Sequence, residues 1–104
     1  MSEEEINIAI AEYRGWQILE PVVHSAITYQ WAIEPDSSKS ILPDCCNDLN
    51  AMREAEMTLP NEIYDEYWTQ LVFVCMSEGE ERMNSASAKL RAKAFAITIG
   101  KWKE

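Results

Sequence analysis

The stretch LPDCCNDLNAMREAE, residues 42–56, is the most helix-like segment of the chain, because it combines a helix start with a one-sided apolar pattern. Pro43 suits the first turn of a helix, where its missing N–H group is not needed. Asp44 can accept hydrogen bonds from the free backbone donors of that turn. Apolar side chains then recur at helical spacing, at Cys45, Leu49, Met52 and Leu59. The stretch therefore predicts a core helix over about Cys45–Met57.

Glu56 lies inside this apolar stripe, four residues after Met52. Two interpretations are open. The carboxylate extends to water at the rim of the core, or it is half-buried and pairs with a cation from another helix, with Arg91 and Lys93 as candidates.

Two further helices are predicted before residue 80. Ser2 and Glu5 have the spacing of a capping box and open a helix of about Glu3–Arg14, which Gly15 ends. A helix of about Glu62–Cys75 follows from an inward stripe at Ile63, Tyr67, Leu71 and Val74. The end of that helix, Leu71–Cys75, is rich enough in β-branched residues to suit a strand as well.

A last helix is predicted near the end of the chain, after a charged loop at residues 77–84. Asn84, Ser85 or Ser87 caps its start, and Gly100 closes it. We expect Trp102 to fold back onto the core.

A small antiparallel sheet is predicted between the first two helices. Apolar and polar residues alternate over residues 27–33, as in a half-buried strand. A shorter strand covers Gln17–Leu19, and Pro21 ends it. His24 is placed in a turn, and residues 35–40 form a polar loop. The chain is thus expected to be one α+β domain, a small helix-rich sandwich of about four helices packed with this sheet.

Composition limits the class of protein. The chain has 104 residues, no apolar run near the roughly 20 residues of a membrane span, and an acidic rather than basic beginning. We expect a soluble protein of the cytoplasm. Cys45, Cys46 and Cys75 form no CxxC pair and are interpreted as reduced core residues rather than disulfide or zinc partners.

The charge is uneven along the chain. Residues 1–81 carry 17 acidic and three basic residues, whereas residues 82–104 carry six basic residues and one acidic residue, for a net charge of −9. Such a surface disfavours binding of DNA or RNA phosphates and suits a basic protein partner. A second interpretation is that the acids only keep the protein soluble.

No catalytic motif is present: the sequence has no GxGxxG, P-loop, HExxH, GxSxG or CxxC pattern, and His24 is its single histidine. A Ser–His or Cys–His mechanism would depend on that residue alone. We expect a protein that is not an enzyme and needs no cofactor or metal.

Three stretches together resemble the phage ABA sandwich domain family, a group of small phage and prophage proteins. They are EEINIAIAEYRGW (4–16), LPDCCNDLNAMREAE (42–56) and SASAKLRAKAFAITIGKWKE (85–104). The resemblance implies a phage-borne accessory protein that works in the bacterial cytoplasm. It supplies no catalytic residues.

These observations favour a protein that acts by binding, such as an inhibitor of a host defence machine, with a CRISPR effector as the example. The candidate partner contacts are acidic: Glu3, Glu4, Glu12, Asp36, Glu62, Asp65, Glu66, Glu78, Glu80 and Glu81. An alternative is sequestration of a nucleotide or small molecule by a basic cluster of Lys89, Arg91 and Lys93. Two other interpretations of this cluster are contact with the acidic body of the fold and plain exposure. A structural or adaptor homodimer is a further alternative.

Overall fold

The structure, a computed structural model, describes residues 1–24, 27–79 and 86–102. Within these ranges the chain forms four helices and a small antiparallel sheet, which confirms the α+β class. The helices are α1 (Glu3–Tyr13), α2 (Leu49–Glu56), α3 (Asn61–Ser77) and α4 (Ala88–Thr98).

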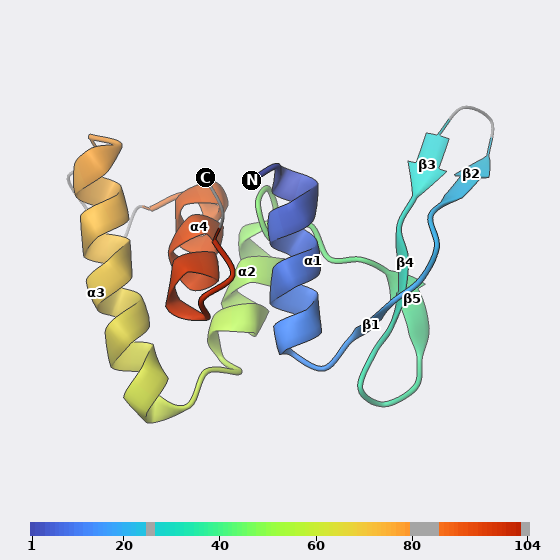
Figure 1. The fold of residues 1–104 in the computed structure, drawn as a ribbon, viewed down its shortest axis with the longest axis horizontal. Coiled ribbons are helices and arrows are strands. Elements are labelled where there is room, and N and C mark those ends of the chain that lie inside the picture. Colours follow the sequence, from blue (N-terminus) through green and yellow to red (C-terminus); the bar gives the residue numbers. More distant parts are fainter. Residues whose placement is uncertain (25–26, 80–85, 103–104) are drawn as a thin grey trace.

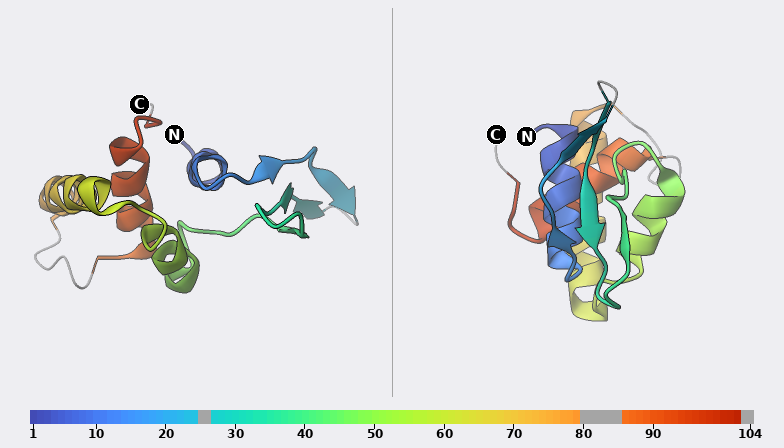
Figure 2. Two further views of the ribbon diagram at one scale, coloured as in Figure 1. Left: turned by 90° about the horizontal axis from the view of Figure 1, so that it is seen from below. Right: turned by 90° about the vertical axis from the view of Figure 1, so that its right-hand side faces the viewer.

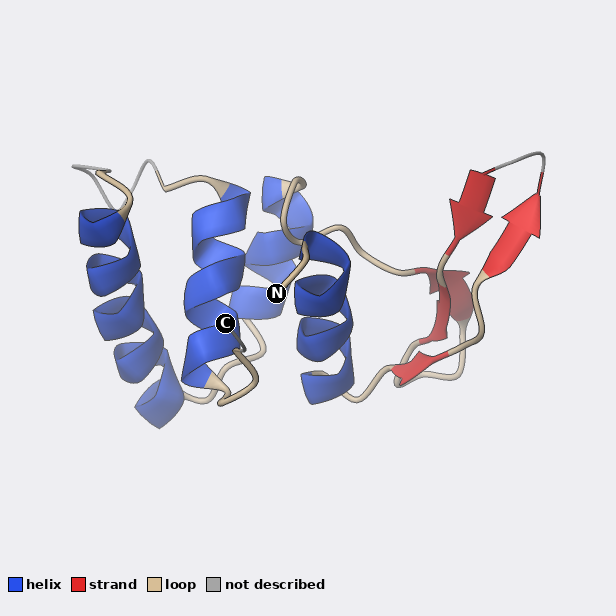
Figure 3. Cartoon of the chain, turned by 45° about the horizontal axis from the view of Figure 1, so that its top comes forward, coloured by secondary structure: helices blue, strands red, loops and turns tan. Residues whose placement is uncertain are grey.

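Helices and strands occupy opposite ends of an elongated molecule of 41 × 29 × 24 Å (Figure 1). α3 is the outermost helix at one end and α4 packs against it. α1 lies between the other helices and the sheet (Figure 2). Colouring by secondary structure makes the separation plain (Figure 3). One side of α3 therefore faces away from the rest of the fold.

The strands form a three-stranded sheet and a two-stranded hairpin. The first has the order β1 (Gln17–Ile18), β4 (Trp31–Ile33) and β5 (Lys39–Ile41), and the second pairs β2 (Val22–His24) with β3 (Ile27–Tyr29). All pairs are antiparallel.

Three expectations for this region were wrong. The strand over residues 27–33 is broken at Gln30, whose side-chain amide donates to the backbone oxygens of Leu19 and Trp31. His24 belongs to β2 instead of a turn, because the hairpin pairs it with Ile27. The end of the polar loop, from Lys39, is strand β5, which pairs with β4. Pairing across the sheet thus overrides the loop-like composition of this segment.

α1 begins as its sequence predicts. Ser2 Oγ accepts a hydrogen bond from Glu5 N at 3.1 Å, and Glu5 Oε1 accepts one from Ser2 N at 3.2 Å, which completes a capping box. Gly15, with φ of 89°, ends the helix in the left-handed region. α1 buries side chains on two sides, with Ile10 in the helical core and Ala11 in a smaller core beneath the sheet.

α2 starts later than predicted, at Leu49, and Asp48 is its N-cap instead of Asp44. The Asp48 carboxylate accepts from Asn50 N at 3.0 Å and from Ala51 N at 3.4 Å. Asp44 instead accepts from Asn7 Nδ2 of α1 at 3.1 Å. This contact holds the turn that precedes α2. The spacing of residues within one segment could not predict it, because the two residues lie far apart in the sequence.

The helical core joins all four helices. Its largest fully buried side chains include Tyr67, Phe95, Ile10 and Met52. The Tyr67 and Phe95 rings meet edge to face with centroids 6.0 Å apart, a favoured aromatic geometry. Trp102 is partly buried against this core, as expected.

The end of α3 and the start of α4 settle two open points. Leu71–Cys75 is helical, because α3 continues to Ser77. Ser87 caps α4 by accepting from Leu90 N at 3.3 Å. The other two cap candidates, Asn84 and Ser85, lie outside the described residues, as does most of the loop predicted at 77–84.

Candidate functional site

The acidic residues predicted as partner contacts do not form one patch. Glu80 and Glu81 lie outside the described residues, and the other eight are spread over four regions. Glu3, Glu4 and Glu12 belong to α1, Asp36 to the turn between β4 and β5, Glu62, Asp65 and Glu66 to α3, and Glu78 to the residue after α3. Only the three on α3 are brought together on one exposed helix face.

Three of the spread acids lie at the surface but already contact other residues of the chain. Glu3 accepts from Asn47 Nδ2 at 2.8 Å and lies 3.6 Å from Lys89 Nζ. Glu78 Oε1 lies 3.5 Å from Lys93 Nζ. Asp36 accepts from Ser38 N, and this hydrogen bond lowers the pKa of Asp36. Their charges are partly compensated within the fold.

One exposed face of α3 combines acidic residues that were predicted as contacts with apolar residues that were not, and we call it the α3 outer face. We define it as the exposed residues at helical spacing along the side of α3 that faces away from the fold: Glu62, Asp65, Glu66, Thr69, Phe73 and Met76. Its N-terminal half is acidic, and no lysine or arginine of the described chain forms an ion pair with those carboxylates. Its C-terminal half is apolar, with Phe73 58% and Met76 71% exposed.

An apolar groove opens beside this face, between α3 and α4. Phe73 and Val74 line it from α3, Ile97 from α4, and Trp102 from the segment after α4, with a volume of about 310 Å³. The polar side chains of Gln70, Ser77 and Lys93 complete its lining. A groove of this kind can receive one bulky apolar side chain from a partner.

The basic residues predicted as an anion site do not meet at one place. Arg91 points into the core, with its guanidinium Nη1 3.1 Å from both oxygens of Glu56 and its Nε donating to Ala86 O at 3.1 Å. Of the two predicted interpretations of Glu56, the ion pair is the correct one. It is more buried than predicted, with Glu56 5% and Arg91 6% exposed.

Tyr67 packs beside this ion pair. Burial raises the pKa of the Tyr67 hydroxyl, and the nearby Glu56 charge raises it further. The hydroxyl makes no well-formed hydrogen bond to Glu56 or to any other described residue. The group of Glu56, Arg91 and Tyr67 is closed to solvent and is interpreted as structural.

Lys89 and Lys93 line a cleft between α1 and α4. Its volume is about 480 Å³, and Ile6, Leu90 and Trp102 supply apolar walls. Lys93 Nζ lies 5.1 Å from the centroid of the Trp102 ring. Contact of the two lysines with the acidic body, which was one of the predicted interpretations, is confirmed by their ion pairs with Glu3 and Glu78.

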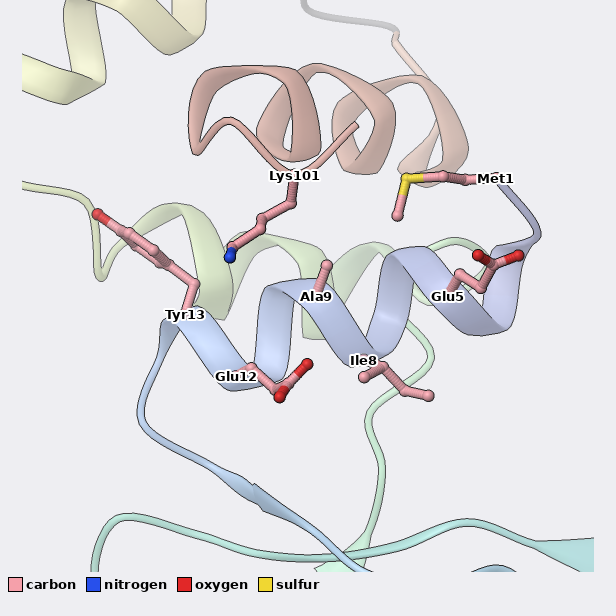
Figure 4. A pocket seen from close by; sticks show the side chains of 7 residues that line it. All are labelled: Met1, Glu5, Ile8, Ala9, Glu12, Tyr13 and Lys101. Carbon is pink, nitrogen blue, oxygen red and sulfur yellow. The ribbon is translucent and has the colours of Figure 1, made fainter. Parts of the chain in front are cut away.

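A second hollow lies along the other side of α1. It has a volume of about 450 Å³ and is lined by Met1, Glu5, Ile8, Ala9, Glu12, Tyr13 and Lys101. Lys101 extends across it toward α1 (Figure 4). The carboxylate of Glu5 is engaged in the capping box.

The cysteines are free and buried, as predicted. Burial raises the pKa of Cys45 to about 11 and that of Cys46 to about 12, which makes both thiols poor nucleophiles. In the described ranges no three His, Cys, Asp or Glu side chains are grouped to hold a metal ion. None of the helices described is both long and apolar enough to span a membrane.

Comparison with known proteins returned no relatives: no protein-family model, curated protein or solved structure matches this chain. The candidate site therefore rests on its own geometry. Sequence reasoning named its acidic half but missed Phe73 and Met76. A signal for them existed, since both recur at helical spacing with Glu62 and Glu66, opposite the buried stripe of α3.

Proposed function

We propose that this chain is a non-enzymatic, phage-encoded accessory protein that acts by binding another protein through its acidic surface. The observation that carries the proposal is the exposed acidic half of the α3 outer face, which has no cationic partner in the described fold. Uncompensated carboxylates attract a basic surface and accelerate association with it.

The resemblance of residues 4–16, 42–56 and 85–104 to phage ABA sandwich proteins supports the phage origin. Host defence proteins that handle nucleic acids bind phosphates with basic grooves, and an acidic protein can compete for such a groove. We therefore propose inhibition of a host antiviral machine, with a CRISPR effector as the leading case, in the cytoplasm of the bacterial host.

A functional assay and a binding assay test this together. The chain is expressed in bacteria that carry CRISPR immunity against a phage, and plaque formation is compared with that of cells lacking the protein. Expression is expected to raise plaque formation. A tagged chain is expected to retain a basic host protein at about 0.1 M salt and to release it near 1 M, where screening is about three times shorter in range.

The two assays separate the parts of the proposal. Unchanged plaque formation with a salt-sensitive partner would reject the anti-CRISPR role and keep the binding role. Retention that ignores salt, or no retained protein, would reject the acidic-surface mechanism itself.

A second candidate function is sequestration of a small anionic ligand in the cleft between α1 and α4. The observation that favours it is the meeting of Lys89, Lys93 and Trp102 around one cleft. It ranks second because both lysines already pair with carboxylates. A thermal-shift panel of nucleotides tests it: a rise in Tm that Lys93→Gln abolishes supports it, and a flat panel rejects it.

A further inference from the structure

The groove between α3 and α4 and the apolar half of the α3 outer face form one surface. Phe73 belongs to both, because its side chain lines the groove and is still 58% exposed. Met76 lies one helical turn further along and is 71% exposed. Burial of large apolar side chains away from water is favourable. Two exposed ones beside an open groove with apolar walls therefore indicate a surface that another molecule contacts.

The acidic half of the α3 outer face limits which kind of molecule can bind to this surface. Phe73 follows Glu66 by seven positions and Glu62 by eleven, which is about 10–17 Å along a helix. α3 contains no lysine or arginine. A matching partner must therefore carry positive charge at one end and apolar bulk at the other.

A second copy of this chain does not satisfy that pattern through the same face. Two antiparallel α3 helices would place acids of one copy opposite Phe73 and Met76 of the other. Two parallel helices would place acids opposite acids, which is unfavourable. Charge complementarity thus points to a different protein.

We infer that the chain binds a basic amphipathic helix of another protein along α3. Arginine or lysine side chains of that helix face Glu62, Asp65 and Glu66, and one bulky apolar side chain enters the groove beside Phe73. The inference rests on the proposed protein-binding function and specifies where, and to what chemistry, it applies.

Synthetic peptides test the inference without knowledge of the natural partner. Three stapled helical peptides of equal length are titrated into the isotope-labelled chain and followed by amide NMR. One carries arginines and a tryptophan anchor at the spacing above, one has alanine in place of the anchor, and one has glutamates in place of the arginines. The first is expected to bind about tenfold more tightly than either of the others. Shifts are expected within residues 62–77 and 93–102.

Matched variants locate the site. The triple variant E62Q/D65N/E66Q and the double variant F73S/M76S are each expected to weaken the first peptide about tenfold. The charge-matched control E20Q/E34Q/E54Q and the apolar control M57S are expected to change binding less than about twofold, since none of these residues belongs to α3 and Met57 is 84% exposed. All changed side chains are at least partly exposed, so the fold is expected to survive, and circular dichroism checks this.

Several results would overturn the inference. One is equal binding of the peptides with and without the anchor, and another is shifts scattered over α1 and α2. A dimer in light scattering that F73S/M76S dissociates would show that a second copy covers the surface. If the salt-sensitive partner of the pull-down is retained equally by both α3 variants, the chain still binds a basic protein, but through acids elsewhere, and the placement of the contact on α3 fails.

Discussion

The buried ion pair between Glu56 and Arg91 is expected to be the most sensitive polar contact in the protein. It ties α2 to α4, and both side chains are 7% exposed, so neither charge can be solvated by water if its partner is removed. Removal of one partner of such a pair costs about 3–5 kcal/mol, because the remaining charge stays buried and uncompensated. We predict this loss for Arg91→Met, which leaves the Glu56 carboxylate buried, and a loss of the same sign for Glu56→Leu.

The predicted loss is large compared with the free energy of unfolding of the whole domain. A domain of this length has a free energy of unfolding of about 5–15 kcal/mol, so Arg91→Met removes a large part of it. The melting temperature is expected to fall by at least about 12 °C, at about 4–8 °C for each kcal/mol. The double variant Glu56→Leu/Arg91→Met removes both charges, so its loss should be much smaller than the sum of the two single losses. The Ala86 carbonyl, which then lacks its Arg91 donor, accounts for about 1 kcal/mol of it.

Urea unfolding followed by circular dichroism gives the four free energies of this double-mutant cycle. The exposed ion pair between Lys89 and Glu3, on the same helix as Arg91, is the matched control. Lys89→Gln is expected to change the free energy of unfolding by less than about 1 kcal/mol. If the single changes cost no more than this control, or if the double change costs the sum of the singles, the ion pair is not desolvated.

Three other measurements check separate features. Cys45 and Cys46 should react with a disulfide reagent at pH 8 far more slowly in the folded chain than in urea, because their pKa values of about 11 and about 12 leave little thiolate; fast native reaction would contradict this. Asp48→Ala should lower the free energy of unfolding by about 1 kcal/mol through loss of the α2 cap, against no more than about 0.5 kcal/mol for Glu54→Ala, and equal losses would argue against the cap. The raised pKa of Tyr67 means that just above pH 10 only the unfolded chain releases the hydroxyl proton, so the melting temperature should fall as pH rises. Tyr67→Phe should make this fall with pH less steep. An equally steep fall in the variant would contradict the raised pKa of Tyr67.

The helices were largely predictable because their signals are local. The capping box at Ser2 and Glu5, the glycine after α1 and the buried stripe of α3 each depend on residues within a few turns. α2 shows where this fails. Asp44 and Asp48 are both good caps by sequence, and the hydrogen bond from Asn7, far away in the chain, decides that Asp44 serves the preceding turn instead.

The sheet and the candidate site depend more on contacts between distant segments. Lys39–Ile41 reads as loop, and its pairing with β4 makes it a strand. The acids Glu62, Asp65 and Glu66 were predicted as contacts from charge alone, but charge could not rank them above Glu3 or Glu78. Only the fold shows that the latter two have lysine partners.

The position of α1 has a consequence for how the protein is made. Ile6 and Ile10 of α1 are buried in the core that includes Phe95 of α4, which leaves the ribosome about 85 residues later. At a synthesis rate of about 5–20 residues per second, Phe95 is made roughly 4–17 seconds after α1. An isolated helix of 11 residues is marginal in water, even with its capping box. During synthesis the apolar face of α1 that packs on α4 is therefore exposed for these seconds, and chaperones bind apolar segments of this kind.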